Sequence, residues 1–336
     1  MTQTLWEQKL KTQDVTPPAV AADVERDAVV VARAMLTADI VELALQATPG
    51  SPSFGSEAWQ PGSHIDVQIP GGAWRQYSLV GNVDDAVWKI CVLHEPNGRG
   101  GSVYLHGINV GDHIVVRGPR NNFPLRPARR HRFLPGGIGV TPLISLAKQA
   151  IASGSDVTFT YCGRSRAAMA FLPELRASLG DRLIVHPDDE TGLPNIAALL
   201  AEVEPETLIY ACGPGGMLDA AVNATGHWPA GALQIERFVP VNTAHGPDIE
   251  FEVEVASTGK SYTVPVSASI LEVLLDNGIQ VLSSCAEGTC GTCETVVVDG
   301  IVDHRDSVLS PEEHELSETM MICVSRARGP RLKLEL

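Results

Sequence analysis

The apolar residues of this chain change their spacing twice along its length. Between residues 27 and 119 they gather in short β-branched runs, such as 28–35, 40–45 and 88–93, which proline, glycine and asparagine separate. Several short strands at this spacing are typical of a small antiparallel β-barrel. The first part of the chain is therefore expected to fold as a barrel.

From about residue 130 the pattern alternates between strand-like and helix-like segments. Strand-like runs begin at Arg132, Val157, Leu183 and Leu208, and a helical pattern follows each of them. This alternation predicts a parallel sheet with helices on both faces. A stretch with two prolines, an asparagine and a glycine, 239–247, is then expected to be a linker.

The last segment has a third pattern. Polar and apolar residues alternate at 251–255, a helical stretch follows at 270–277, and apolar runs at 296–298 and 332–336 enclose a cysteine-rich region. The expected division is an N-terminal extension (1–24), a barrel domain (25–126), a parallel-sheet domain (127–238), a linker (239–247) and a third domain (248–336).

Four cysteines of the third domain carry the most specific chemical signal. Cys285, Cys290 and Cys293 have the spacing C-x4-C-x2-C, and Cys323 stands apart. Thiolates at this spacing hold plant-type 2Fe–2S clusters. Structural zinc sites usually show two short Cys-x-x-Cys pairs, whereas only one such pair is present here. We therefore expect a 2Fe–2S cluster and a role in electron transfer.

Composition narrows the class of protein further. The chain has 336 residues, 44% of them hydrophobic, which suits two or three domains. No run approaches the roughly 20 apolar residues of a membrane span, and the first residues lack a signal-peptide pattern. A cytoplasmic, monomeric enzyme without a membrane partner is expected. Seven cysteines in that setting indicate metal ligation and not a disulfide framework.

Charge is uneven along the chain. The net charge is −15, which disfavours nucleic-acid binding. Residues 248–336 contain 16 Asp or Glu against 6 Lys or Arg, a net charge of −10. This acidity either keeps the domain in solution or steers it toward a basic patch on a partner. Charge alone leaves both interpretations open.

Two glycine-rich segments have the composition of phosphate-binding turns. In the segment 136–142, Gly137 and Gly139 fit the first two positions of a dinucleotide fingerprint, with Pro142 in the third. Thr141 is expected to cap the following helix, whose N-terminus can receive a pyrophosphate. In the segment 97–102, glycine frees backbone N–H groups to form an anion nest.

Two more short motifs complete the set, Arg75-Gln-Tyr77-Ser78 in the barrel and Cys212-Gly213-Pro214 at a strand end. With the domain order and the cysteine loop, they resemble the phthalate dioxygenase reductase family, which includes reductase components of vanillate-type demethylases. The resemblance covers about residues 25–336. It implies a flavin-binding barrel, an NAD domain of the ferredoxin–NADP reductase type and a C-terminal β-grasp ferredoxin domain.

The resemblance also assigns flavin contacts. It implies that Arg75 holds the flavin phosphate, that Tyr77 packs on the isoalloxazine and that Ser78 lies near the reactive nitrogen. A guanidinium can donate two parallel hydrogen bonds to a phosphate, and a phenol has a flat apolar face and a polar hydroxyl.

The resemblance also indicates which of two flavins, FAD or FMN, this chain binds. Relatives that bind FAD usually carry Ser or Thr where this chain has Gly81, and the turn with Gly100, Gly101 and Ser102 is similar to the family's FMN phosphate turn. FMN is therefore favoured over FAD.

Nicotinamide contacts follow in the same way. The resemblance places the Cys212 thiol near the nicotinamide, with Gly213 and Pro214 beside it, so Ser78 and Cys212 are the expected catalytic residues. Arg164 and Arg166 stand where an acidic residue would take the ribose hydroxyl, which favours NADPH. Most family members look NADH-dependent, so NADH is expected and NADPH stays an alternative.

Two remaining segments resemble family features of lower specificity. Glu236-Arg-Phe238 is similar to a segment that closes near the flavin. His304-Arg305-Asp306 is similar to a part of the ferredoxin domain and is expected to be a structural turn near the cluster.

The expected function is that of an oxygenase reductase. Electrons would pass from NADH through FMN and the 2Fe–2S cluster to a Rieske-type terminal oxygenase or demethylase, docked through the acidic domain. The alternative is the same relay serving a haem monooxygenase. A redox sensor would need an output domain, for which only the segment 1–24 is left.

Overall fold

The computed structural model describes residues 24–54, 59–83, 85–240, 248–309 and 311–336. Nearly all of the predicted N-terminal extension and most of the predicted linker lie outside these residues. The chain divides into two compact units, one ending at Glu236 and one beginning at Arg237. Each unit is described by itself below.

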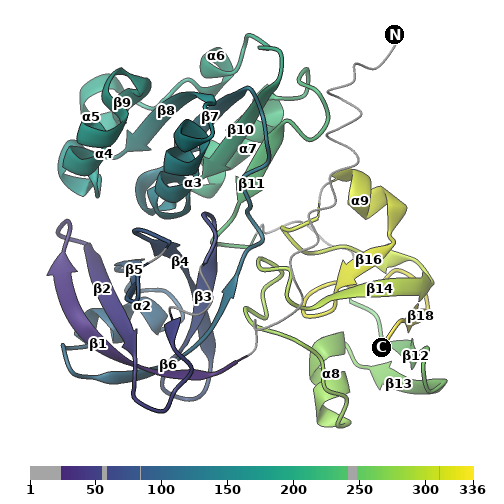
Figure 1. Cartoon of the computed structure of the whole chain (residues 1–336). Helices are drawn as coiled ribbons and strands as arrows, with labels where there is room; N and C mark the ends of the chain where they lie inside the picture. The colour runs from purple at the N-terminus through teal and green to yellow at the C-terminus, as the bar shows by residue number, and fades with distance from the viewer. Residues whose placement is uncertain (1–23, 55–58, 84, 241–247, 310) are drawn as a thin grey trace. The chain divides into compact units, whose positions relative to one another are not determined.

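The first unit begins with a closed barrel of antiparallel strands in the order β1-β2-β5-β4-β3-β6 (Figure 1). Its strands are β1 (Arg26–Met35), β2 (Ile40–Ala47), β3 (His64–Gln68), β4 (Trp74–Val80), β5 (Trp88–Leu93) and β6 (His113–Arg120). Pairing of β1 with β6 closes the barrel, so neither strand is left as a free edge. Alternate side chains point inward and form an apolar core that includes Val30, Leu43 and Ile65. The short helix α2 (Gly101–Gly107) adds Leu105 to it.

A five-stranded parallel sheet follows in the order β11-β10-β7-β8-β9. Its strands are β7 (Arg130–Pro135), β8 (Asp156–Gly163), β9 (Leu183–Pro187), β10 (Thr207–Cys212) and β11 (Leu233–Glu236). Its helices are α3 (Val140–Ala152), α4 (Leu172–Leu179), α5 (Asp188–Thr191), α6 (Ile196–Leu199) and α7 (Gly215–Ala224), with short 3-10 turns η2 (Gly137–Gly139), η3 (Arg166–Ala168) and η4 (Gly180–Arg182). Separate apolar clusters form with α3 and α4 and with α6 and α7. The sheet is thus covered on both faces, as the alternating pattern predicts.

Barrel and sheet share a small apolar contact within the first unit. Val80 and Cys91 of the barrel pack with Ala170, Ile138 and Phe171 of the sheet domain. Apolar side chains from both domains are therefore removed from water where β4 meets the region around η2 and α4.

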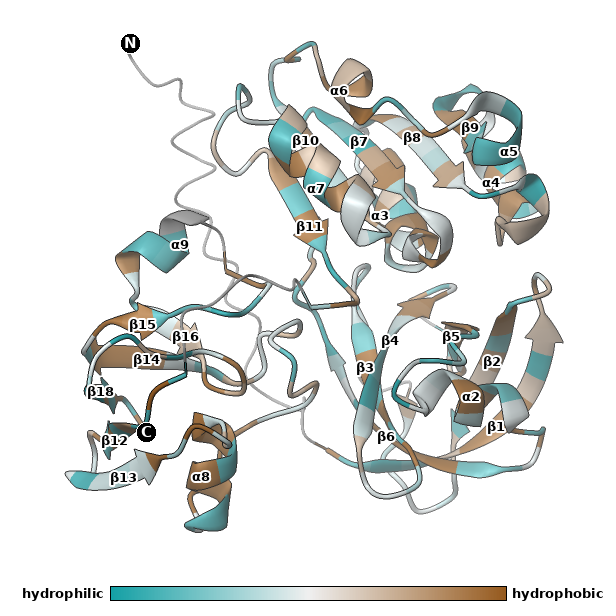
Figure 2. Cartoon of the chain, turned by 180° about the vertical axis from the view of Figure 1, so that it is seen from behind, coloured by the Kyte–Doolittle hydropathy of each residue, from teal (hydrophilic) through white to brown (hydrophobic). Residues whose placement is uncertain are grey.

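The second unit contains a mixed sheet in the order β13-β12-β18-β14-β16. Its strands are β12 (Phe251–Val255), β13 (Lys260–Val264), β14 (Glu294–Asp299), β16 (Thr319–Met321) and β18 (Arg331–Leu334), and β15 (Val302–Asp303) pairs with β17 (Arg326–Ala327). Helix α8 (Ile270–Asp276) begins with a capping box between Ser269 and Glu272. It is amphipathic (Figure 2) and buries Ile270, Leu271 and Leu274 against the sheet. A second short helix, α9 (Pro311–Leu316), precedes β16.

The helices of the described residues are all short or polar, and none of them is suited to crossing a bilayer.

Candidate functional site

The second unit brings the four predicted cluster ligands together. The side chains of Cys285, Cys290, Cys293 and Cys323 are buried and form no disulfide. Cys285 makes side-chain hydrogen bonds with Cys290 and Cys323, and Cys323 makes another with Cys293. Because Cys290 and Cys323 donate to its sulfur, the pKa of the Cys285 thiol lies well below its usual range. The same bonds raise the pKa of Cys290 and Cys323.

This arrangement fits an iron–sulfur cluster. Four thiols at one buried point cannot all ionise unless a positive centre compensates their charge, and metal coordination deprotonates thiols outright. Two irons with four thiolate ligands supply that compensation. The donor set of the structure therefore matches the cluster that the spacing predicts.

The cysteine loop needs glycine at Gly288, whose φ is +67°. A Cβ atom at this position would lie 2.5 Å from Cγ2 of Val324 and 3.0 Å from Cα of Asp306. Any side chain would therefore push the loop away from the segment that carries Cys323. The N–H of Glu287 lies 3.3 Å from the sulfur of Cys285, and hydrogen bonds of this kind tune cluster potentials.

The first glycine motif lies where the order of the parallel strands reverses. Strand β7 has β8 on one side and β10 on the other, so the connections diverge at its carboxyl end. There the N–H of Gly136 donates to the carbonyl of Cys212 at 2.8 Å. A Cβ atom at Gly139 would lie 2.1 Å from the same oxygen. Two motifs found separately in the sequence thus pack backbone to backbone, at the kind of edge where open α/β sheets bind nucleotides.

Thr141 does not cap helix α3, and that prediction is wrong. The helix begins at Val140 after Gly139, which makes no side-chain cap hydrogen bond. Thr141 is buried, and its hydroxyl donates to the carbonyl of Ile138 at 3.0 Å. The cause is η2, which runs directly into α3 and places Thr141 in the first helical turn. The first-turn N–H groups are left without a side-chain cap, as a pyrophosphate-binding helix requires.

Arg75 and Tyr77 lie on one face of β4, beside the glycine turn that precedes α2. A Cβ atom at Gly101 would lie 2.6 Å from Cγ of Arg75 and 3.0 Å from the hydroxyl of Tyr77, so only glycine lets the turn come this close. Arg75 donates to the carbonyl of Arg99 at 2.9 Å, which fixes its guanidinium against the turn. A guanidinium beside glycine-freed N–H groups fits a phosphate.

Ser102 and Gly100 shape the same turn. The Ser102 hydroxyl donates to the carbonyl of Glu95 at 3.1 Å and lies 3.0 Å from the N–H of the same residue. Gly100 has a φ of +83°, which favours glycine. The structure thus gives Ser102 a role in holding the turn, and direct contact with a phosphate stays a prediction.

Ser78 lies on the opposite face of β4 from Tyr77. It is buried, and Val80 on the same face packs against Ile138 and Ala170 of the sheet domain. Ser78 therefore faces the side of the barrel that meets the nucleotide motif. Burial raises the pKa of Tyr77 to about 12, so its phenol is neutral at physiological pH.

Cys212 and Glu236 are cross-strand neighbours in the pairing of β10 with β11. Cys212 is fully buried, and burial first and the Glu236 carboxyl second raise the pKa of its thiol. Cys212 is therefore a protonated thiol and not a thiolate nucleophile. Its contact with a nicotinamide stays a prediction.

Glu236 becomes a functional candidate only in the structure, since sequence analysis included it only as part of a closing segment. Its side chain is half-buried, but Oε2 is shielded from solvent and has no hydrogen-bond partner among the described residues. Burial raises the pKa of Glu236 to about 8. No motif signals an unpartnered carboxyl, because its environment comes from the pairing of two distant strands.

Arg166 has a carboxylate partner at the expected ribose end of the nucleotide site. Its Nε and Nη2 donate to the two oxygens of Glu190 at 2.7 and 2.9 Å. These hydrogen bonds raise the pKa of Arg166 and lower the pKa of Glu190. The side chain of Arg164 is 79% exposed and lies 3.8 Å from Asp39. Because Glu190 already occupies the Arg166 guanidinium, the pair favours NADH over a 2′-phosphorylated nucleotide.

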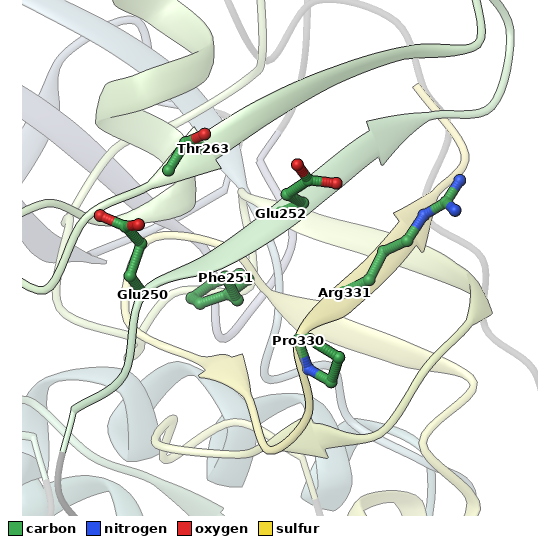
Figure 3. Close-up of a pocket in the computed structure, with 6 residues that line it drawn as sticks. All are labelled: Glu250, Phe251, Glu252, Thr263, Pro330 and Arg331. Carbon is green, nitrogen blue, oxygen red and sulfur yellow. The ribbon is translucent and has the colours of Figure 1, made fainter.

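A pocket of about 460 Å³ lies elsewhere, on the second unit over β12 and β18 (Figure 3). It is lined by Glu250, Phe251, Glu252, Thr263, Pro330 and Arg331. None of the predicted site residues lines it. The carboxylates of Glu250 and Glu252 make it unsuited to the phosphates of a flavin or a nicotinamide nucleotide.

Comparison with known proteins places these features in a family. Residues 253–328 match the model of the 2Fe-2S iron-sulfur cluster binding domain. The chain is 41% identical to the putative toluene-4-sulfonate monooxygenase system reductase subunit of Comamonas testosteroni, over 89% of this chain and 95% of that protein. It is 36% identical to the phthalate dioxygenase reductase of Burkholderia cepacia, over 89% of this chain and 93% of that protein.

Solved structures agree with these relatives. A phthalate dioxygenase reductase, described as a modular structure for electron transfer from pyridine nucleotides to [2Fe-2S], matches with a TM-score of 0.65 and 34% identity, over 93% of this chain and 98% of that one. An intact type IV self-sufficient cytochrome P450 monooxygenase matches with a TM-score of 0.83 and 40% identity, over 93% of this chain but 41% of that one. The predicted family, the oxidoreductase activity and the 2Fe–2S cluster are thereby confirmed. The chain belongs to the phthalate dioxygenase reductase family, the electron-transferring reductase components of multicomponent oxygenases.

Proposed function

We propose that this chain passes electrons from NADH, through FMN and a 2Fe–2S cluster, to a Rieske-type terminal oxygenase or demethylase. The family confirms FMN, NADH and a 2Fe–2S cluster as cofactors. The observation that carries the proposal is the set of four buried cysteines that the second unit brings together without a disulfide. They lie on the same chain as the glycine corner after β7 and the glycine turn beside Arg75.

The domains divide this work. The barrel (25–126) is the flavin domain, the parallel-sheet domain (127–238) binds the nucleotide, and the β-grasp domain (248–336) holds the cluster. When bound, the flavin accepts electrons as a pair and releases them singly, which matches a two-electron donor to a one-electron cluster. The protein contributes placement and electrostatics.

Named side chains carry that placement. Arg75 and the turn around Gly101 bind the flavin phosphate, and the neutral phenol of Tyr77 covers the flavin ring. Ser78 lies on the barrel face toward the nucleotide domain. The close packing of Gly139 on the backbone after Cys212 supports a narrow crevice that holds the nicotinamide and excludes water.

The partner is a terminal oxygenase, because the relatives are reductase subunits of oxygenase systems. Its docking through the acidic domain is supported by the net charge of −10 that residues 248–336 carry by sequence. Monomeric state and cytoplasmic location stay predictions.

A haem monooxygenase is the second candidate acceptor. Its support is the similarity, at 40% identity, to part of a self-sufficient cytochrome P450 monooxygenase. The two acceptors can be separated by mixing the NADH-reduced protein anaerobically with a Rieske oxygenase and with a haem monooxygenase from the same cell. The true partner will be reduced much faster.

An anaerobic NADH titration followed by visible absorption and low-temperature EPR tests the relay itself. We expect the flavin and cluster bands to bleach together and a rhombic signal of a reduced 2Fe–2S cluster to appear. Bleaching of the flavin without that signal would contradict the proposal.

A further inference from the structure

Three potential metal ligands converge in the second unit beside the cysteine loop. His304, Asp306 and His314 each offer one ligand atom, and these atoms lie within 4.8 Å of one another. Nδ1 of His304 is 3.6 Å from Oδ1 of Asp306, and Nε2 of His314 is 3.3 Å from the same oxygen. Ligands of a tetrahedral zinc ion, each about 2.0–2.1 Å from the metal, are about 3.3–3.4 Å apart. The two distances to Oδ1 of Asp306 are already close to that value.

Hydrogen bonds place the proton of the neutral His304 ring on Nε2, the nitrogen that does not face Asp306. The Ser317 hydroxyl donates its one hydrogen to the carbonyl of His314 at 2.9 Å. Its oxygen therefore accepts from Nε2 of His304, 3.1 Å away. The neutral ring then presents the lone pair of Nδ1 to the Asp306 carboxylate. Outer partners of this kind set the tautomer of metal-ligating histidines.

The lone pair of Nδ1 of His304 accepts no hydrogen bond from the described residues. The His304 side chain is 5% exposed, and Nδ1 is buried without a hydrogen-bond partner among the described residues. A buried lone pair that faces a carboxylate is repelled unless a cation lies between them.

Asp306 is held in the orientation that a ligand needs. Its carboxylate is fully shielded, and Oδ2 accepts from the N–H groups of Val308 at 3.1 Å and Leu309 at 2.9 Å. Oδ1 then faces both histidines, and it also accepts from the Ser325 hydroxyl at 3.4 Å. A carboxylate fixed by backbone donors loses little freedom on binding a metal.

We propose that Nδ1 of His304, Oδ1 of Asp306 and Nε2 of His314 bind a divalent ion of the zinc class, with water completing the coordination. Two imidazoles and one carboxylate are a common zinc donor set. The two imidazole rings lie nearly parallel, with centroids 4.4 Å apart and an interplanar angle of 18°. Because a metal lies near the plane of each ring that binds it, binding turns the His314 ring. That side chain is 31% exposed on the short helix α9.

The site is adjacent to the loop that holds the cluster. The N–H of Ser307 donates to the carbonyl of Gly288 at 2.8 Å, and Gly288 packs against Cα of Asp306. A bound ion would therefore tie α9 to the segment that supports the cysteine loop. Its role is structural, and it adds nothing to the transfer of electrons.

Calorimetric titration of the cluster-loaded, full-length protein with ZnCl2 tests this site. The protein is first treated with EDTA, and visible absorption confirms that the cluster is retained. We expect one zinc ion per cluster. His314→Gln should weaken binding by at least 10- to 100-fold, the range that loss of even an outer partner costs. His113→Gln, which alters an exposed histidine of the barrel, is the matched control and should bind as the wild type does.

Two results would overturn the proposal. One is a wild-type protein that binds no zinc, and the other is a His314→Gln variant that binds zinc as tightly as the wild type. If this variant loses its cluster, anomalous diffraction from zinc-soaked wild-type crystals decides instead. A zinc peak among the three ligand atoms supports the site, and a peak only elsewhere refutes it.

Discussion

Replacing Glu236 with glutamine is expected to remove a pH dependence of stability from the first unit. Oε2 of Glu236 is shielded from solvent and has no hydrogen-bond partner among the described residues. Burial raises the pKa of this carboxyl from 4.5 to about 8. Glutamine has nearly the same shape and cannot ionise, so the variant isolates the effect of charge.

The sign and size of the effect follow from linkage. The folded pKa lies above the unfolded pKa, so the contribution of Glu236 is fully present below pH 4.5 and is lost as pH rises to about 8. At about 1.4 kcal/mol per pH unit, the whole span sets an upper limit of about 5 kcal/mol. Between pH 6 and pH 9 the loss is about 2–3 kcal/mol. Partial exposure of the side chain reduces these figures.

Urea unfolding of the flavin-loaded protein, followed by flavin fluorescence between pH 6 and pH 9, measures this difference. We expect the free energy of unfolding of the wild type to fall relative to that of Glu236→Gln as pH rises. Glu202→Gln changes an exposed carboxylate of the same domain and serves as the control. Parallel pH profiles for the wild type and Glu236→Gln would refute the reasoning, because they would mean that Glu236 ionises normally in the folded protein.

Three further substitutions test other parts of the molecule. Cys290→Ser should leave NADH-dependent ferricyanide reduction intact and abolish the EPR signal of the reduced cluster; loss of both in a flavin-loaded protein would contradict the relay order. Glu190→Gln should lower the KM for NADPH and leave the KM for NADH unchanged, because it releases the Arg166 guanidinium. The effect is modest since both side chains are exposed. An unchanged KM for NADPH would count against a role of the Arg166–Glu190 pair in cofactor choice. Gly139→Ala should destabilise the nucleotide domain by about 1–3 kcal/mol or more, since its Cβ would lie 2.1 Å from the carbonyl of Cys212; wild-type NADH kinetics and melting temperature would show that this contact is loose.

Residue spacing was sufficient wherever the chemistry depends on local geometry. Cys285, Cys290 and Cys293 are ligands from one loop, so their spacing alone specified the cluster. Only Cys323 depends on the tertiary fold, which brings it to the same point. The glycine motif could also be recognised from the sequence, because the corner requires a positive φ of +55° at Gly137 and close backbone contact at Gly139.

The errors and omissions arose where tertiary context decides. Thr141 has the composition of an N-cap, but the 3-10 turn before it starts the helix early and gives its hydroxyl another partner. The sequence around Glu236 alternates like any strand end, so nothing in it signals burial of the carboxyl. The Arg166–Glu190 pair joins residues from different β–α connections, and the topology of the sheet creates it.

Burial disfavours the charged form of ionisable side chains at both candidate sites, but the side chains stay neutral at one site and must ionise at the other. At the proposed nucleotide site, burial raises the pKa values of Cys212 and Glu236, so both side chains are mainly neutral at pH 7. Neutral side chains at these two positions would not oppose the pyrophosphate that we propose for the N-terminus of α3. At the cluster site, the thiols of the cysteine loop and of Cys323 are also buried, yet their function requires them to ionise. Only a positive metal centre can offset four negative charges, so the ionisation of all four thiols together depends on the cluster, whereas the neutrality of Glu236 depends on the fold alone.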